Sequence, residues 1–219
     1  MTDNRMAGLA LIVASCGSII TMAVHPSGHI HPAQLDSTIR MLIVVHSVAL
    51  AWIPVQFLGS WGLSRQIAGS GRSGVIGLVL YGFALIVIAN AAVADGLVIP
   101  QVLRQIVASA GSQPAVDNWQ MLSRYTFYWN QGYAQVFTVG SSAAIAAWSV
   151  GIWRGGPFAR GLGIYGIALA IVTVGLLFSG HLPLDAHRFG AVVLGQAIWF
   201  SIAGAQLSTI DSALTAVAG

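Results

Sequence analysis

Six stretches of apolar residues, each about 20 residues long, alternate with short polar segments along the chain. A helix of about 20 apolar residues is long enough to cross the hydrocarbon core of a membrane, which is roughly 30 Å thick. The stretches lack the period-two alternation of transmembrane β-strands, and a helix satisfies its own backbone in lipid. The pattern therefore predicts an all-α integral membrane protein. The expected spans are about 6–24, 40–63, 74–99, 129–152, 159–180 and 187–207.

The connection between the third and fourth spans, about 100–124, is the only long one. Its apolar residues fall at helical spacing opposite Arg104 and Gln105. These apolar residues are Val102, Leu103, Ile106 and Val107. We therefore predict a short interfacial helix on the outer side of the membrane. Because six spans occupy more than half of the chain, residues 1–219 are expected to form one transmembrane domain, a six-helix bundle.

Composition supports the membrane assignment and excludes several functions. Hydrophobic residues make up 56% of the chain and charged residues 7%, whereas a soluble protein has roughly 25% charged residues. All nine cationic residues are arginine, which excludes a lysine Schiff base and a P-loop phosphate lysine. The single cysteine, Cys16, excludes an intramolecular disulfide and CxxCH haem attachment. No basic stripe with interleaved aromatic residues is present, so no nucleic-acid partner is expected.

The arginines indicate an orientation. One set of alternate loops carries Arg5, Arg65, Arg72, Arg154 and Arg160. The other set carries Arg40, Arg104, Arg124 and Arg188, with Asp36, Asp95, Asp117 and Asp185 beside them. The positive-inside rule then places both termini in the cytoplasm. The chain is similar in general character to small six-span bacterial membrane proteins, and we expect a multi-pass protein of the inner membrane.

The segment from Gly161 to Gly166 has the GxGxxG spelling of a dinucleotide-binding loop. That loop requires a preceding strand and an acidic residue about 20 positions later, and neither is present. Small residues along a membrane helix allow close helix packing. We therefore interpret these glycines as packing positions.

The six histidines lie near one side of the expected membrane. His25, His29 and His31 follow the first span, His46 lies within the second, and His181 and His187 flank the turn before the sixth. Imidazole and carboxylate ligands suit zinc or copper. We predict His46, His181 and His187 as metal ligands, with Asp185 as a ligand or orienting acid. Asp95, within the third span, is a candidate general base or supporting acid.

The segment between the first two spans offers a further set of ligands. His29 and His31 form a His-x-His pair flanked by prolines, and in an extended backbone both rings project to the same side. Short histidine-rich tracts often bind metal. The alternative is that they are polar residues at the membrane surface.

An aromatic run opens the fourth span. Tyr128, Trp129 and Asn130 are candidates for binding an amphiphilic ligand, although amphipathic rings also anchor helices at the headgroup level. Polar residues gather in the outer half of the spans, which indicates either an outward vestibule or interhelical hydrogen bonding. They include Asn90, Asp95, Asn130, Gln131 and Gln135.

Three functions remain open. The leading hypothesis is an outward-facing site for a divalent metal that acts on a lipid or other amphiphile. The second is electron transfer through b-type haem held by two histidines, with His46 and His187 as the pair. The third is a transporter or a small-ligand-binding protein without enzymatic activity. The lipid bilayer is an expected partner, and a homo-oligomer is left open.

Overall fold

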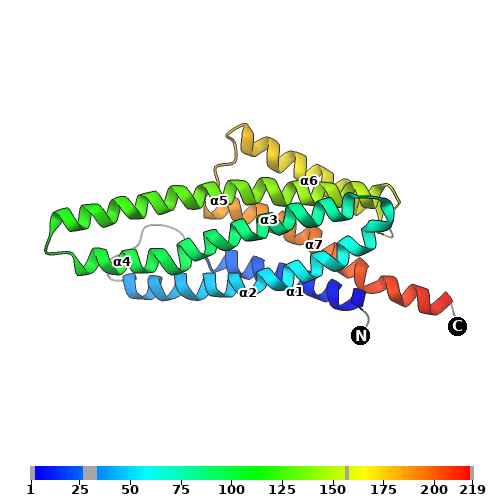
Figure 1. Cartoon of the computed structure of the whole chain (residues 1–219), viewed down its shortest axis with the longest axis horizontal. Coiled ribbons are helices and arrows are strands. Elements are labelled where there is room, and N and C mark those ends of the chain that lie inside the picture. The colour runs from blue at the N-terminus through cyan, green and yellow to red at the C-terminus, as the bar shows by residue number, and fades with distance from the viewer. Residues whose placement is uncertain (1–2, 27–33, 156–157, 218–219) are drawn as a thin grey trace.

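The computed structural model describes residues 3–26, 34–155 and 158–217, and helices make up nearly all of them (Figure 1). In chain order the elements are α1 (Asp3–Ala23), α2 (Leu35–Ile67), the short 3-10 helix η2 (Ala68–Ser70), α3 (Ser73–Val93), the π-helical turn η3 (Ala94–Val98), α4 (Ile99–Ala108), α5 (Gln113–Trp153), α6 (Arg160–Phe178) and α7 (Ala186–Val217). The elements α3, η3 and α4 follow one another without a break.

Six helical segments are long and apolar enough to cross a membrane, as the hydropathy pattern predicts. They are Asp3–Ala23, Leu35–Ile67, Ser73–Ala108, Gln113–Trp153, Arg160–Phe178 and Ala186–Ile210. Large apolar side chains cover the outside of these helices, including Val44, Leu58, Val79 and Ile86, each at least 60% exposed. An apolar surface of this kind suits contact with lipid and not with water.

The connection between the third and fourth spans differs from the prediction, because a separate interfacial helix is not evident among the described residues. Residues 99–108 instead continue the third helix as α4, and α5 begins at Gln113. Pro100 lies at the beginning of α4, directly after the π-helical turn η3, and the helix continues past it. At 41 residues, α5 is about 60 Å long, and its beginning extends with α4 past α2 (Figure 1).

The helices pack in a regular order. α1 packs against α2 and α7, α2 packs against α3, and α5 packs against α3 and α6. The beginning of α1 and the end of α7 lie at the same end of the bundle (Figure 1). α1 and α7 approach so closely that a Cβ on Gly8 would stand 2.4 Å from the carbonyl oxygen of Gly204. Glycine is therefore needed at this crossing.

The core is aromatic in the half of the bundle near the termini. Trp148 of α5 and Trp199 of α7 are fully buried and stack with ring centroids 6.0 Å apart. The indole N–H of Trp148 donates to Ser64 Oγ at 2.9 Å and to the Gly74 carbonyl at 3.2 Å. Gly163 and Gly166 of α6 lie against α5 and the Trp199 ring, which confirms these two glycines as packing positions. Gly161 is not one, because nothing lies within 4 Å of a Cβ placed on it.

Candidate metal centre

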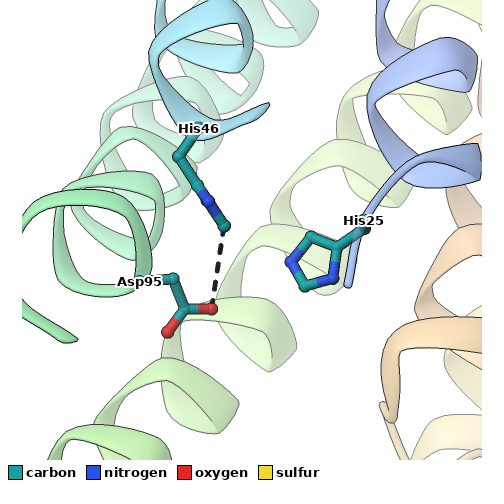
Figure 2. Close-up of side chains that lie close together, drawn as sticks. All are labelled: His25, His46 and Asp95. Carbon is teal, nitrogen blue, oxygen red and sulfur yellow. Dashed lines mark ion pairs between the residues drawn. The ribbon is translucent and has the colours of Figure 1, made fainter. Parts of the chain in front are cut away.

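Three side chains that can bind a metal meet in the half of the bundle away from the termini (Figure 2). His25 lies two residues after the end of α1, His46 lies in α2, and Asp95 lies in η3. One ligand atom from each lies within 4.8 Å of the other two. His46 Nε2 is 3.9 Å from Asp95 Oδ2, and the two imidazole ring centroids are 5.1 Å apart. Figure 2 shows the His46 ring pointing toward the Asp95 carboxylate and the His25 ring facing it from the other side.

A backbone hydrogen bond fixes the tautomer of each imidazole. His46 Nδ1 lies 2.8 Å from the Leu42 carbonyl oxygen, and His25 Nδ1 lies 3.0 Å from the Pro26 carbonyl oxygen. A carbonyl oxygen only accepts, so in both rings Nδ1–H is the donor. The lone pair of each neutral ring is therefore on Nε2. Histidines that bind metals commonly use this arrangement, in which one ring nitrogen is anchored and the other is left for the ion.

The carboxylate is also held in place. The side-chain amide of Asn130, on α5, donates to Asp95 Oδ2 at 2.5 Å. This contact joins η3 to α5 across 35 positions of sequence. Asn130 Oδ1 is buried and has no hydrogen-bond partner among the described residues. An amide that orients a carboxylate in this way is typical of the groups that support a metal ligand.

The local backbone of η3 permits this meeting. A π-helical turn places one extra residue in a helix and is frequent at functional sites. Gly96, the residue after Asp95, is buried against the ring of His46, so that α2 approaches the turn closely. The absence of a side chain at Gly96 thus allows the Asp95 carboxylate and the His46 imidazole to lie close together.

Burial shapes the electrostatics of the cluster. Only 6% of His46 is exposed, while His25 and Asp95 are half-buried. Burial lowers the pKa of His25, the nearby His46 lowers it further, and Asp95 acts in the opposite direction. The neutral imidazole is the form that binds a metal. His25 is therefore biased toward that form.

The other predicted ligands lie elsewhere. His181 and His187 are exposed and do not belong to this group of three. His181 Nδ1 lies 2.9 Å from Ser179 Oγ, and His187 lies in the first turn of α7. His29 and His31 lie outside the described residues. The pairing of His46 with His187 around a haem stays a prediction.

Asp185 caps a helix. Its Oδ1 accepts from the backbone N–H of Arg188 at 2.9 Å, and its Oδ2 lies 3.3 Å from the Arg188 guanidinium. Asp185 is exposed, and it directly precedes α7. Its contacts are those of a carboxylate at a helix N-terminus.

Two of the three predicted amphiphile-binding residues point outward. Tyr128 is 72% exposed and Trp129 is 48% exposed. Trp129 Nε1 donates to the Tyr125 hydroxyl at 3.2 Å, one turn earlier on α5. Asn130 differs, because it faces Asp95. A ligand-binding role for Tyr128 and Trp129 stays a prediction.

A cavity of about 280 Å³ adjoins the cluster between the end of α1 and the beginning of α7. His25 and His187 both line it. The rest of its wall is apolar or small: Ile19, Met22, Ala23, Ala186, Gly190 and Leu194. His25 therefore borders both the candidate metal position and an apolar space.

The chain matches no known protein family, no curated protein and no solved structure.

Proposed function

We propose that this chain is a multi-pass membrane protein that binds one divalent, zinc-like cation through His25, His46 and Asp95. The observation that carries the proposal is the anchoring of both Nδ1–H groups to backbone carbonyls, with one oxygen of the Asp95 carboxylate within 4.8 Å of a nitrogen of each ring. Two imidazoles and one carboxylate form a common zinc ligand set. A carboxylate within a membrane helix is costly unless a positive charge lies beside it, and a bound cation supplies that charge.

Three protein ligands leave one coordination position open. A divalent cation with an open position activates a bound water for hydrolysis. The roles of the chain's own residues follow from their contacts. His25, His46 and Asp95 would hold the ion, and Asn130 would keep the carboxylate in position.

The proposed substrate is a lipid or another amphiphile. The support is the 280 Å³ cavity, because His25 forms part of its wall while Ile19, Met22 and Leu194 offer apolar contacts. An apolar chain in this cavity would lie next to the cation, and its polar head would reach the open position. Mostly apolar cavities with a few polar groups are typical of such ligand sites.

We further propose an inner-membrane location with both termini in the cytoplasm. The five arginines in one set of alternate loops, against four in the other, support this orientation. The metal centre would then lie in the outer half of the bundle. Single cysteines placed at position 65 or at position 124, in a Cys16→Ser background, test the orientation. Labelling from outside at position 65 but not at position 124 would contradict the proposed orientation.

Metal analysis of purified protein tests the proposal. Protein loaded with zinc and then freed of unbound ions should retain about one zinc ion per chain. His46→Gln and Asp95→Asn should lose most of it. His181→Gln is the matched control, because His181 is exposed and outside the cluster. Equal zinc content in wild type and His46→Gln, or none in wild type, would overturn the proposal.

The same preparation distinguishes the haem alternative. Protein produced with ample haem should show no Soret band if the site holds a divalent cation. A Soret band that disappears in both His46→Gln and His187→Gln would instead favour the haem-binding function.

A further inference from the structure

A second cavity, of about 120 Å³, lies one helical turn from the metal centre, toward the termini. Thr21, Ala49 and Ala92 line it, and each is three or four residues along its helix from one of the three candidate ligands. The wall is mostly apolar and partly aromatic: Ile53, Leu85, Ile88, Phe137, Phe189 and Val193. Helices α1, α2, α3, α5 and α7 all contribute to this wall, so the cavity is in the interior of the bundle.

Two buried polar atoms in this wall have no hydrogen-bond partner among the described residues. They are Trp52 Nε1, a donor, and Gln56 Oε1, an acceptor. Gln56 is only 6% exposed. The side-chain amide of Gln56 also interacts with the Tyr81 hydroxyl, which leaves Oε1 as its unpaired end. An unpaired polar atom in such a place is costly, so each one needs an explanation.

The hydroxyls of Ser18 and Thr21, which also line the cavity, do not pair with Trp52 Nε1 or Gln56 Oε1. Ser18 Oγ donates to the Ala14 carbonyl at 2.9 Å, and Thr21 Oγ1 donates to the Gly17 carbonyl at 2.8 Å. Both hydroxyl protons are therefore directed to their own helix.

The ring of Trp52 packs tightly against α1. A Cβ on Gly17 of α1 would stand 2.3 Å from the Trp52 ring, so the ring lies directly on the α1 backbone. Trp52 and Gln56 are four residues apart on α2, and residues at this spacing are neighbours on one helix face. One unpaired donor and one unpaired acceptor thus belong to neighbouring residues of α2 in the wall of this cavity.

A single hydroxyl group satisfies both atoms. Its oxygen accepts from Trp52 Nε1, and its proton is donated to Gln56 Oε1. An apolar cavity of about 150 Å³ accommodates benzene, so this cavity of about 120 Å³ has room for at most one aromatic ring. We propose that the cavity binds the ring of a hydroxylated aromatic compound of the phenol or hydroquinone class, with its hydroxyl between Trp52 and Gln56.

This site is separate from the metal centre and does not depend on the proposed function. None of its polar contacts involves His25, His46 or Asp95. The same ring chemistry has two sources, namely a small soluble phenol and the headgroup of a membrane hydroquinone.

Ligand-observed fluorine NMR of the full chain in lipid nanodiscs tests the proposal, with 4-fluorophenol as the probe. Fluorobenzene has the same ring without the hydroxyl, and 4-fluoroanisole keeps the oxygen but lacks the proton. We expect 4-fluorophenol to bind about tenfold more tightly than either, after subtraction of empty nanodiscs, because each leaves a buried polar atom unpaired. Equal binding of all three compounds, or no binding above empty nanodiscs, would overturn the proposal.

Two variants test the residues. Gln56→Met and Trp52→Phe each replace one of the two polar partners with an apolar side chain. Gln56→Met should abolish the preference for 4-fluorophenol over 4-fluoroanisole, because no acceptor remains for the phenol proton. Trp52→Phe should reduce the preference over fluorobenzene several-fold, because only one of the two hydrogen bonds remains. Either result alone is sufficient if the other variant does not fold. Trp61→Phe is the control, because Trp61 lies on the same helix but is 51% exposed. Preferences unchanged from wild type in the folded variants would contradict the assignment.

Competition then identifies the source. Decylhydroquinone in the nanodisc should displace 4-fluorophenol if the site receives a membrane hydroquinone. If 4-fluorophenol binds with the expected preference and is not displaced, the site receives a soluble phenol. Both outcomes support a hydroxylated ring as the ligand.

Discussion

Gly96 and His46 lie in direct contact: a Cβ on Gly96 would stand 2.3 Å from the Cβ of His46. The contact joins η3 to α2 at the point where Asp95 turns toward the imidazole. A side chain at position 96 would have to displace either the histidine or the π-helical turn. The candidate metal centre therefore depends on a residue that itself carries no ligand atom.

Gly96→Ala should weaken zinc binding by tenfold or more, because His46 can no longer hold its distance from Asp95. Zinc affinity by isothermal titration calorimetry checks this expectation. Gly132→Ala, on α5, is the matched control, since nothing lies within 4 Å of its added Cβ. Alanine favours helix over glycine, so the control should bind zinc as wild type does and be slightly more stable. Wild-type affinity in Gly96→Ala would show that the contact is not needed.

Asn130→Ala should also weaken zinc binding, although Asn130 is not a proposed ligand. Loss of a residue that orients a metal ligand typically reduces affinity by about 10–100-fold. Because the ion and its three ligands remain, the zinc stoichiometry at saturation should stay near one. Gln135→Ala serves as the control, because Gln135 is exposed on the same helix. If Asn130→Ala and Gln135→Ala bind zinc equally well, the amide does not position Asp95.

Trp148→Phe should destabilise the bundle without affecting the metal centre. The substitution removes the indole donor to Ser64 Oγ and to the Gly74 carbonyl, and it reduces the stack on Trp199. Loss of a buried hydrogen-bond donor costs about 1–3 kcal/mol. Thermal unfolding in detergent measures the effect, and Trp153→Phe, at a tryptophan that is 56% exposed, is the control. Equal midpoints for the two variants would contradict the account of the core.

Stability should depend on pH through Asp185. The backbone N–H of Arg188 lowers the pKa of Asp185 below its usual value of 3.8, and the Arg188 charge lowers it further. A carboxyl group with a lowered pKa in the folded state contributes stability above the unfolded pKa and loses it as pH falls through the folded pKa. Asp185→Asn should therefore be less stable than wild type at pH 7. The difference should shrink as the pH falls below 3.8 and through the lowered pKa of folded Asp185. A difference that does not change with pH would contradict this role of Asp185.

Much of the fold could be predicted from hydropathy, because the length of an apolar helix is a local property. The third and fourth helices were the exception. The sequence predicts that the third span ends at about residue 99, yet α4 continues it to Ala108 with Pro100 near its beginning. Val102 is 3% exposed and packs into the bundle, so tertiary contacts continue the helix after the apolar run has ended. A sequence window does not contain those contacts.

The site was only partly predictable. His46 and Asp95 could be selected because a polar residue in an apolar helix needs a partner. Their grouping with His25 could not, because the spacing of 25, 46 and 95 forms no motif and depends on which helices are neighbours. His181 and His187 were predicted as ligands from a shared side of the membrane, but being near the same side does not fix where a side chain points. Gln56 is also a polar residue in an apolar helix, whereas Trp52 gives no such signal, and only the cavity reveals that their polar atoms are unpaired.

X-ray absorption at the zinc edge, on the zinc-loaded chain, tests the metal centre most directly. We expect nitrogen and oxygen ligands at about 2.0–2.1 Å, with the outer-shell scattering of two imidazole rings. In His46→Gln this scattering should fall to that of one ring or vanish with the zinc. A zinc spectrum identical in wild type and His46→Gln, or a wild-type chain that retains no zinc, would contradict the account.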